Sequence, residues 1–341
     1  MERQMKKEKS RRDTALLILL IMPAAAAFLS LLLGRLPISV RECFGILFGR
    51  LFGAERHWTQ IQENMVLLVR VPRVLIAMLV GMALSVAGTS YQCIFRNPMA
   101  APDILGASTG AAFGAALAIL RGLGGTEVTL FAFVSSMACV ALVMLCSRLC
   151  RGNPIVDLVL SGIMIGSLFS AATSYLKLIA DPNNSLPAIT YWMMGSLAGA
   201  SAGKLAYVWI PMLLAFIPIM ALRWKINLLT LDDDEARSMG VNTRLTRGVV
   251  IVCATLLTAA SVSVSGMIGW VGLVIPHLAR RVVGGDCRIL IPASALIGGT
   301  FLIAVDDLAR CLYTTELPLG VLTAFIGAPF FIYLMGRRGV W

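Results

Sequence analysis

The sequence predicts an all-α, polytopic membrane protein with about ten transmembrane helices. The 341 residues are 58% hydrophobic and only 14% charged, whereas about 25% of a soluble protein is charged. Long apolar runs recur along the chain, each near the roughly 20 residues that a bilayer demands. These runs are continuous and do not alternate with polar residues, which favours helices over a membrane β-barrel.

Ten apolar runs are the predicted spans, and short polar segments separate them. They are residues 14–33, 74–94, 104–120, 128–149, 155–180, 205–222, 248–264, 268–283, 289–305 and 320–335. Pro211, Pro218 and Pro276 fall inside runs and predict kinks there. Because no segment between the runs is long enough for a core of its own, we expect residues 1–341 to form one transmembrane domain.

The charges near the first span predict the orientation. Residues 1–13 carry six Lys/Arg ahead of a run that is longer than the apolar core of a signal peptide, so we expect a retained helix. Counted alternately from there, most of the 29 Lys/Arg fall on the N-terminal side of the membrane. The positive-inside rule then places both termini in the cytoplasm of a protein of the inner (cytoplasmic) membrane. The net charge of +11 therefore requires no nucleic acid partner.

Small residues line two of the predicted spans. Gly106, Gly110 and Gly114 lie on one helix face, which allows another backbone to approach closely. A second span has a small, mildly polar face over residues 161–174. Such faces are typical of tight helix packing or of a pore wall. A face can serve both purposes if it lies at a subunit interface that surrounds a passage.

Residues 223–247 form the one long charged insertion in the chain. Residues 231–240 (LDDDEARSMG) predict a short helix, with acids where the helix dipole favours them and Gly240 at its C-terminus. Thr230 and Asp233 have capping-box spacing, and Asn242 or Thr243 could cap the next helix. A rigid charged helix between two spans is suited to contacting a partner in water; the alternative is a solvated connector.

The residues that would power transport or catalysis are scarce. Asp157, Lys177, Asp306 and Asp307 all fall near span ends, so the chain lacks the buried carboxylates that are typical of ion-driven transport. Phosphate-loop and hydrolase motifs are absent, and with two histidines and eight scattered cysteines we expect no catalytic residue, metal site, cofactor or disulfide framework. The chain is thus not expected to be an enzyme, and a separate subunit should supply the energy.

Three arginines, Arg70, Arg73 and Arg310, lie on the predicted outer side, where positive charge is disfavoured. One reading pairs Arg310 with Asp306 or Asp307 and places Arg73 against lipid headgroups. The other reading is a docking patch for an acidic external partner, since arginine forms directed pairs with carboxylates.

Several long motifs in the same order resemble the permease subunits of iron-siderophore, haem and cobalamin ABC importers, the FecCD/BtuC-like type II importer family. The resemblance covers nearly the whole chain. The matching segments are residues 70–73 (RVPR), 88–110 (GTSYQCIFRNPMAAPDILGASTG), 191–196 (YWMMGS), 231–242, 266–280 (GMIGWVGLVIPHLAR), 316–321 (ELPLGV) and 327–331 (GAPFF).

The resemblance implies a ten-helix permease that pairs with a second permease subunit, identical or homologous, around a central passage. Two cytoplasmic ABC ATPase subunits would bind the coupling helix, and an external substrate-binding protein would dock on Arg70, Arg73 and Arg310. Asn97, Pro98 and Met99 match the turn that helps close the passage on the cytoplasmic side. The matching coupling residues are Leu231, Asp233, Asp234, Glu235, Ala236, Arg237, Met239 and Gly240.

The predicted function is therefore the membrane permease of an ATP-driven importer for a metal chelate, with a ferric siderophore as the first candidate. Haem or a cobalamin-type corrinoid is the alternative cargo. An ion-coupled secondary transporter is disfavoured by the missing buried carboxylates, and a membrane-embedded enzyme by the lack of clustered catalytic groups.

Overall fold

The computed structural model describes residues 2–34, 36–52, 57–150, 152–313 and 315–336, and every regular element in them is helical. Two of these elements are short and are not α-helices: the π-helical turn η1 (Met65–Arg70) and the 3-10 turn η2 (Pro102–Leu105). The α-helices are α1 (Glu2–Leu32), α2 (Val40–Phe52), α3 (Gln60–Asn64), α4 (Val71–Phe95), α5 (Ala107–Leu120), α6 (Gly125–Leu149), α7 (Pro154–Leu178), α8 (Ser185–Met193), α9 (Ala202–Leu228), α10 (Asp233–Ser238), α11 (Thr243–Ser265), α12 (Val271–Val283), α13 (Cys287–Cys311) and α14 (Leu319–Met335).

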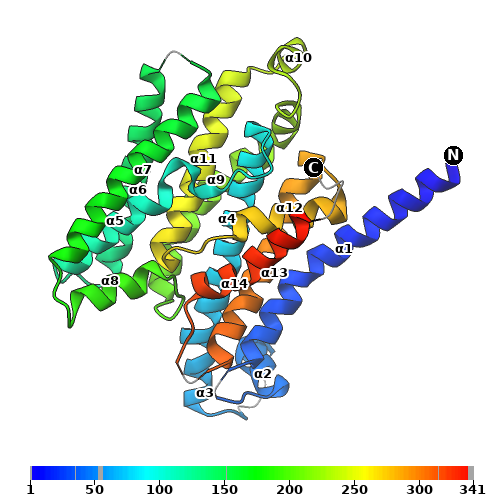
Figure 1. The fold of residues 1–341 in the computed structure, drawn as a ribbon. Coiled ribbons are helices and arrows are strands. Elements are labelled where there is room, and N and C mark those ends of the chain that lie inside the picture. The colour runs from blue at the N-terminus through cyan, green and yellow to red at the C-terminus, as the bar shows by residue number, and fades with distance from the viewer. Residues whose placement is uncertain (1, 35, 53–56, 151, 314, 337–341) are drawn as a thin grey trace.

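The long helices run side by side as one bundle (Figure 1). One side consists of α5, α6 and α7, while α4 lies inside and packs against α9, α11, α12 and α13. The short helix α10 lies at one end of the bundle, which we call the α10 end, and α2 and α3 lie at the opposite end. The first turns of α1 project away from the bundle on the side of the α10 end.

Each of the ten predicted spans coincides with a helix, which confirms the all-α membrane fold. Six helices are long and apolar enough to cross a membrane: the continuous helix Gln60–Phe95, together with α6, α7, α9, α11 and α13. Leu17–Leu32, Ala107–Leu120 and Leu319–Tyr333 are shorter apolar helices, and α12 has 13 residues. The basic N-terminal segment continues α1, but Met1 and the side chains of residues 2–16 lie outside the described part of the chain.

Glycines bring α4 into direct backbone contact with its neighbours. A Cβ atom on Gly88 would lie 1.9 Å from the carbonyl oxygen of Gly272 in α12, and one on Gly81 would lie 2.2 Å from the carbonyl oxygen of Gly298 in α13. No side chain fits at such distances, so these positions require glycine. Close approach of this kind is how membrane helices gain packing energy without a hydrophobic driving force between them.

The two small-residue faces pack as close helix contacts. A Cβ on Gly114 would lie 2.2 Å from the carbonyl oxygen of Phe131 in α6, and one on Gly162 of α7 would lie 2.2 Å from that of Ile104 in η2. The serines of α7, Ser167, Ser170 and Ser174, lie on an exposed face instead. In α7 the glycines therefore serve packing, whereas the serines are exposed, with the Ser167 and Ser174 hydroxyl groups donating to the carbonyl oxygens of Ile163 and Ser170 one turn earlier.

Two irregular segments interrupt the bundle, and each contains a non-glycine residue with positive φ. Arg96 (φ 50°) ends α4 and starts the turn that leads to η2. Trp270 (φ 70°) precedes α12, after residues 266–269 have left the helical conformation. Such conformations cost energy and are enriched at functional sites.

The cysteine expectation was wrong at one pair. A disulfide joins Cys93 of α4 to Cys287 at the start of α13. Because their sequence separation is 194, the spacing of the two cysteines gives no sign of the pairing, which follows from the packing of α4 against α13. The other six cysteines are free, as expected.

We predict that Gly88→Ala destabilises the protein, because its methyl group would meet a backbone carbonyl that cannot move aside. Overpacking typically costs about 1–3 kcal/mol, so the unfolding midpoint of the purified protein in detergent should fall. Gly248→Ala is the matched control, because a Cβ there meets nothing within 4 Å and alanine favours the helix. Equal midpoints for the two variants would contradict the close α4–α12 contact.

Candidate functional site

The charged helix α10 stands at the end of the bundle as predicted, but its N-terminus differs from the predicted one. Its N-cap is Asp232, which makes no side-chain cap bond, and the Thr230 hydroxyl donates to the Asn227 carbonyl oxygen instead. The Thr230–Asp233 capping box was therefore wrong, because Thr230 still belongs to the turn that ends α9. Gly240 has φ +81° and Asn242 caps α11 by accepting from Leu245 N at 3.0 Å, as predicted.

The eight predicted coupling residues divide by burial. Ala236 is fully buried and anchors α10, and Asp233 is half-buried. The others form an exposed surface at the α10 end: Leu231, Asp234, Glu235, Arg237, Met239 and Gly240. Two of the six are large hydrophobic residues, Leu231 at 36% and Met239 at 56% exposure. A rigid helix with exposed apolar and charged side chains is suited to binding a protein surface.

Arg96 connects this helix directly to the end of α4. Its guanidinium donates to Asp232 Oδ1 at 2.6 Å, to Asp233 Oδ1 at 2.7 Å and to the Leu229 carbonyl oxygen at 3.2 Å. The left-handed backbone of Arg96 directs the chain into the following turn while its side chain holds α10. Arg96 thus belongs to the turn after α4 by its backbone and to the contact with α10 by its side chain.

Arg247 of α11 holds the same carboxylate from the other side. It donates to Asp233 Oδ1 at 3.0 Å and to Oδ2 at 3.2 Å. The hydrogen bonds from Arg247 and the nearby arginines lower the pKa of Asp233 from its usual value. A lowered pKa means that the carboxylate's contribution is present above the ordinary carboxyl range and is lost as pH falls through the lowered pKa. Asp233 is therefore ionised and bridged at neutral pH.

The predicted gate residues form a tight turn next to Arg96. The Asn97 side chain accepts from Met99 N at 2.8 Å, and Ala100 N donates to the Asn97 carbonyl oxygen at 3.0 Å. Pro98 lies between them and restricts the backbone. The Met99 side chain is 43% exposed. The turn is rigid, and it presents an apolar side chain beyond the bundle.

A cavity of about 250 Å³ lies where the two irregular segments meet. Ala101, Pro102 and Asp103 line one wall, and the other wall consists of Ile268, Gly269, Trp270, Gly272 and Leu273. The segments touch closely, since a Cβ on Gly272 would lie 2.3 Å from Pro102 Cγ. Asp103 accepts a hydrogen bond from Ser108 of α5 and is otherwise exposed. Asp103 lies within the matching segment 88–110, but the sequence pattern assigned it no role of its own.

At the opposite end, the three predicted docking arginines are buried within the chain. Arg73 is 7% exposed and forms two-pronged pairs with Asp306 at 2.9 Å and with Glu316 at 2.8–2.9 Å. Asp306 itself is 1% exposed. The expectation that the chain lacks buried carboxylates was therefore wrong at Asp306, which lies inside α13 and is paired with Arg73. This arrangement joins α4, α13 and the segment before α14.

The other two arginines are also held internally. Arg310 is 8% exposed, pairs with Asp307, and donates to the carbonyl and hydroxyl oxygens of Ser30 at 2.6 and 2.7 Å. Arg70 is 3% exposed and donates to carbonyl oxygens at the end of α1, including that of Leu31 at 2.7 Å. The pairing of Arg310 with Asp307 agrees with the first of the two alternatives drawn from the sequence. The same alternative was wrong in placing Arg73 against lipid headgroups, because Arg73 is buried against Asp306 and Glu316. The docking role stays a prediction, with internal bracing as its competitor.

Three of the motifs also meet at backbone level. Ser196 N donates to the Ser265 carbonyl oxygen at 2.7 Å, and Leu319 N donates to that of Gly195 at 2.9 Å. These bonds join the segment after α8 to the end of α11 and the start of α14. Gly195 and Gly266 both have positive φ, which lets the two non-helical segments approach each other closely here.

We predict that Arg73→Ala lowers the unfolding midpoint, because it leaves the Asp306 carboxylate buried without its main partner. Removing one member of a buried ion pair costs about 3–5 kcal/mol. Arg121→Ala, at an exposed arginine after α5, is the control and should leave the midpoint unchanged. If Arg73→Ala matched Arg121→Ala in stability, Arg73 would not be a structural brace, and the docking role would gain support.

Comparison with known proteins agrees with this architecture. The profile of the FecCD transport family matches residues 18–337. The molybdate import system permease protein MolB of Haemophilus influenzae is 39% identical over 94% of this chain and 96% of its own length. The Fe(3+) dicitrate transport system permease protein FecD of Escherichia coli is 37% identical over 92% of this chain and 95% of its own.

A solved structure supports the same assignment. It describes an inward-facing conformation of a metal-chelate type ABC transporter, superimposes with a TM-score of 0.85 at 37% identity, and covers 95% of this chain and 99% of its own. Family profile, relatives and structure agree over almost the entire length. This chain belongs to the FecCD transport family.

Proposed function

We propose that this chain is the permease subunit of an ATP-driven ABC importer that carries a metal chelate or metal oxyanion across the cytoplasmic membrane. The observation that carries the proposal is the bonding of α10 to the Asn97–Met99 turn through Arg96. A contact helix joined to a turn beside a cavity is the arrangement that a permease driven by another subunit requires. ATP hydrolysis belongs to that separate subunit.

The ATPase subunits would bind the α10 end of the bundle. The exposed residues of α10 and its flanks supply charged and apolar groups for this contact, whereas Ala236 is buried and makes α10 move with the bundle beneath it. Under this proposal the α10 end faces the cytoplasm, and so do both chain termini.

The turn of Asn97, Pro98 and Met99 would be part of the inner gate. A push or pull on α10 reaches Arg96 through two carboxylates, and Arg96 is covalently next to Asn97. Because proline and the Asn97 hydrogen bond keep the turn rigid, a displacement at Arg96 moves Met99 with it. Two-state motion of this kind would open and close the passage on one side.

A second permease subunit, either a copy of this chain or a homologue, would complete the passage. The exposed face of α7 carries Ser167, Ser170 and Ser174 beside large apolar residues such as Ile163 and Leu168. Apolar residues of this kind suit a helix interface, and hydroxyl groups suit the wall of a passage for a polar cargo. An external substrate-binding protein would deliver cargo at the end opposite α10.

Two cargo classes remain in competition. The motif resemblance favours a ferric siderophore, and the Fe(3+) dicitrate relative agrees with an iron chelate. The molybdate permease relative, at 39% identity over 94% of this chain, favours a metal oxyanion as the second candidate.

We predict that Arg96→Ala uncouples ATP hydrolysis from uptake. In vesicles reconstituted with the ATPase and binding protein, ATPase association should persist, because α10 keeps its exposed surface and the Asp233–Arg247 bond. Cargo taken up per ATP hydrolysed should fall at least about tenfold, since the gate loses its link to α10. Arg223→Ala is the control, an exposed arginine of α9 at the same end. Unchanged uptake per ATP in Arg96→Ala would refute the link.

The cargo prediction is tested by uptake with a panel of radiolabelled compounds: a ferric hydroxamate siderophore, ferric dicitrate, haem, cobalamin and molybdate. Cells that lack the chromosomal copy and express the whole importer should accumulate one ferric chelate, and excess unlabelled molybdate should not compete. Accumulation of molybdate alone would move the assignment to the second candidate. Accumulation of none, with an intact complex, would refute the importer proposal.

A further inference from the structure

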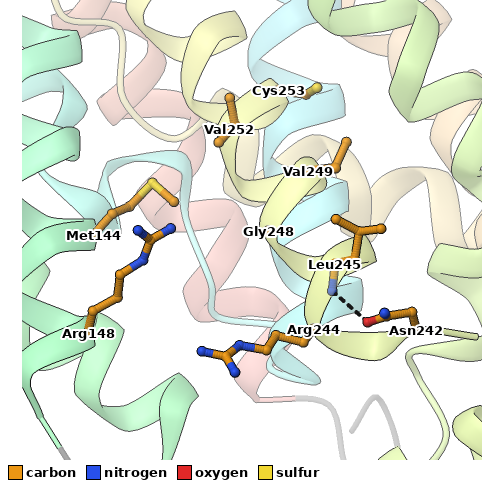
Figure 2. Close-up of a pocket in the computed structure, with 9 residues that line it drawn as sticks. All are labelled: Met144, Arg148, Asn242, Arg244, Leu245, Gly248, Val249, Val252 and Cys253. Carbon is orange, nitrogen blue, oxygen red and sulfur yellow. Dashed lines mark hydrogen bonds between the residues drawn. The ribbon is translucent and has the colours of Figure 1, made fainter.

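An open groove lies between α6 and α11 at the α10 end, apart from the gate and its cavity. Its volume is about 540 Å³. Met144 and Arg148 line it from the last turns of α6, and the first turns of α11 form the facing wall (Figure 2). Both helices are long and apolar enough to span a membrane. The groove therefore lies where two membrane helices reach one membrane surface.

Two arginines stand at the mouth of this groove. The guanidinium groups of Arg148 and Arg244 extend from α6 and α11 into the same opening (Figure 2). Both side chains are exposed, and neither forms an ion pair with any carboxylate in the described part of the chain. Arg247, one turn further along α11, is by contrast held by Asp233. The mouth thus carries two positive charges that the protein does not neutralise.

The rest of the groove is apolar. Leu245, Val249 and Val252 follow one face of α11, and Leu245 and Val252 are 65% and 43% exposed. Gly248 lies among them, and a Cβ at that position would meet nothing within 4 Å. This glycine does not serve helix packing, unlike those of α4. It widens the groove along the helix.

We propose that this groove binds an anionic phospholipid, with its phosphate on Arg148 and Arg244 and an acyl chain along Leu245, Gly248 and Val252. Guanidinium groups pair with phosphate oxygens through directed, charge-assisted hydrogen bonds. Basic pockets between membrane helices at the cytoplasmic surface are suited to acidic headgroups. A soluble protein partner would satisfy the two charges with carboxylates but would not fill a groove that continues along the apolar face of α11 beside Met144 of α6.

The lipid would act on the coupling element. The groove uses the first turns of α11, the helix whose Arg247 holds Asp233, and Asn242, the cap of α11, also lines it. A bound lipid would hold α6 and α11 together at the base of α10. The proposal rests on the proposed function for the choice of membrane leaflet and for the coupling role of α10, whereas lipid binding itself is independent of both.

The test is a titration of the purified full complex in neutral detergent, following the unfolding midpoint. Phosphatidylglycerol should raise the midpoint in a saturable way, whereas phosphatidylcholine should not. In the double variant Arg148→Gln/Arg244→Gln, half-saturation should need about 25-fold more phosphatidylglycerol, since each basic group near an anionic lipid surface contributes about a factor of five. Arg223→Gln/Lys225→Gln removes the same charge from exposed positions at the same end and should titrate like the wild type.

A second variant tests the apolar part of the groove. Gly248→Leu fills the space without changing charge or meeting any atom at its Cβ, and it should abolish the saturable response while leaving the lipid-free midpoint intact. Glycerol phosphate, which has no acyl chain, should not replace the lipid.

Three results would overturn the proposal. They are an equal response in the Arg148/Arg244 double variant and the wild type, full stabilisation by glycerol phosphate, and loss of the ATPase from the double variant with an unchanged lipid response. The last would make the groove part of the ATPase interface. None of these measurements depends on transport, so a result that overturns the lipid proposal leaves the importer proposal unaffected.

Discussion

The direct backbone contact of α4 with α12 and α13 is the constraint on which the rest of the structure depends. At Gly81 and Gly88 of α4, a Cβ would come within 2.2 Å of a neighbouring carbonyl oxygen. Interiors packed at this density do not deform continuously and move between discrete arrangements. We therefore expect α4 to move as a rigid helix. The residues with candidate functions lie at its two ends: Arg70 and Arg73 at its N-terminus, and Arg96 with the Asn97–Met99 turn at its C-terminus.

The two ends are held by interactions of different strength, and the difference suits their roles. Arg73 and Asp306 are buried, and breaking such a pair costs about 3–5 kcal/mol, so that end is fixed. The Arg96 pairs are accessible to water, since the side chains of Arg96, Asp232 and Asp233 are 32%, 82% and 37% exposed, and ion pairs at the surface contribute only about 0.2–1 kcal/mol each. An ATPase that binds α10 could supply enough energy to rearrange the contacts of Arg96 without breaking the Arg73–Asp306 pair. The α10 end is thus the adjustable end of a rigid helix.

Sequence reasoning predicted the ten helical segments, the exposed charged helix α10, the left-handed Gly240 and the Asn242 cap, because apolar periodicity and capping are local properties. It predicted the local pairing of Arg310 with Asp307 but not the partners of Arg73, since Asp306 and Glu316 lie 233 and 243 residues from Arg73. The Cys93–Cys287 bond and the Arg96–Asp233 bridge were missed for the same reason. The Thr230 capping box failed because α9 continues beyond the apolar run 205–222 to Leu228, and Thr230 lies in the turn that ends it. Chain-distant pairing depends on helix packing, which one sequence does not reveal.

The central claim is that Arg96 transmits movement of α10 to the gate turn. The most direct measurement is the reaction of Met99→Cys with a membrane-impermeant thiol reagent in reconstituted complexes, with the exposed Cys150 and Cys311 replaced by serine. With Arg96 present, the labelling rate should change on addition of ATP. With Arg96→Ala, the rate should be the same with and without ATP, although ATP hydrolysis continues. An ATP-dependent change of equal size in both proteins would contradict the claim.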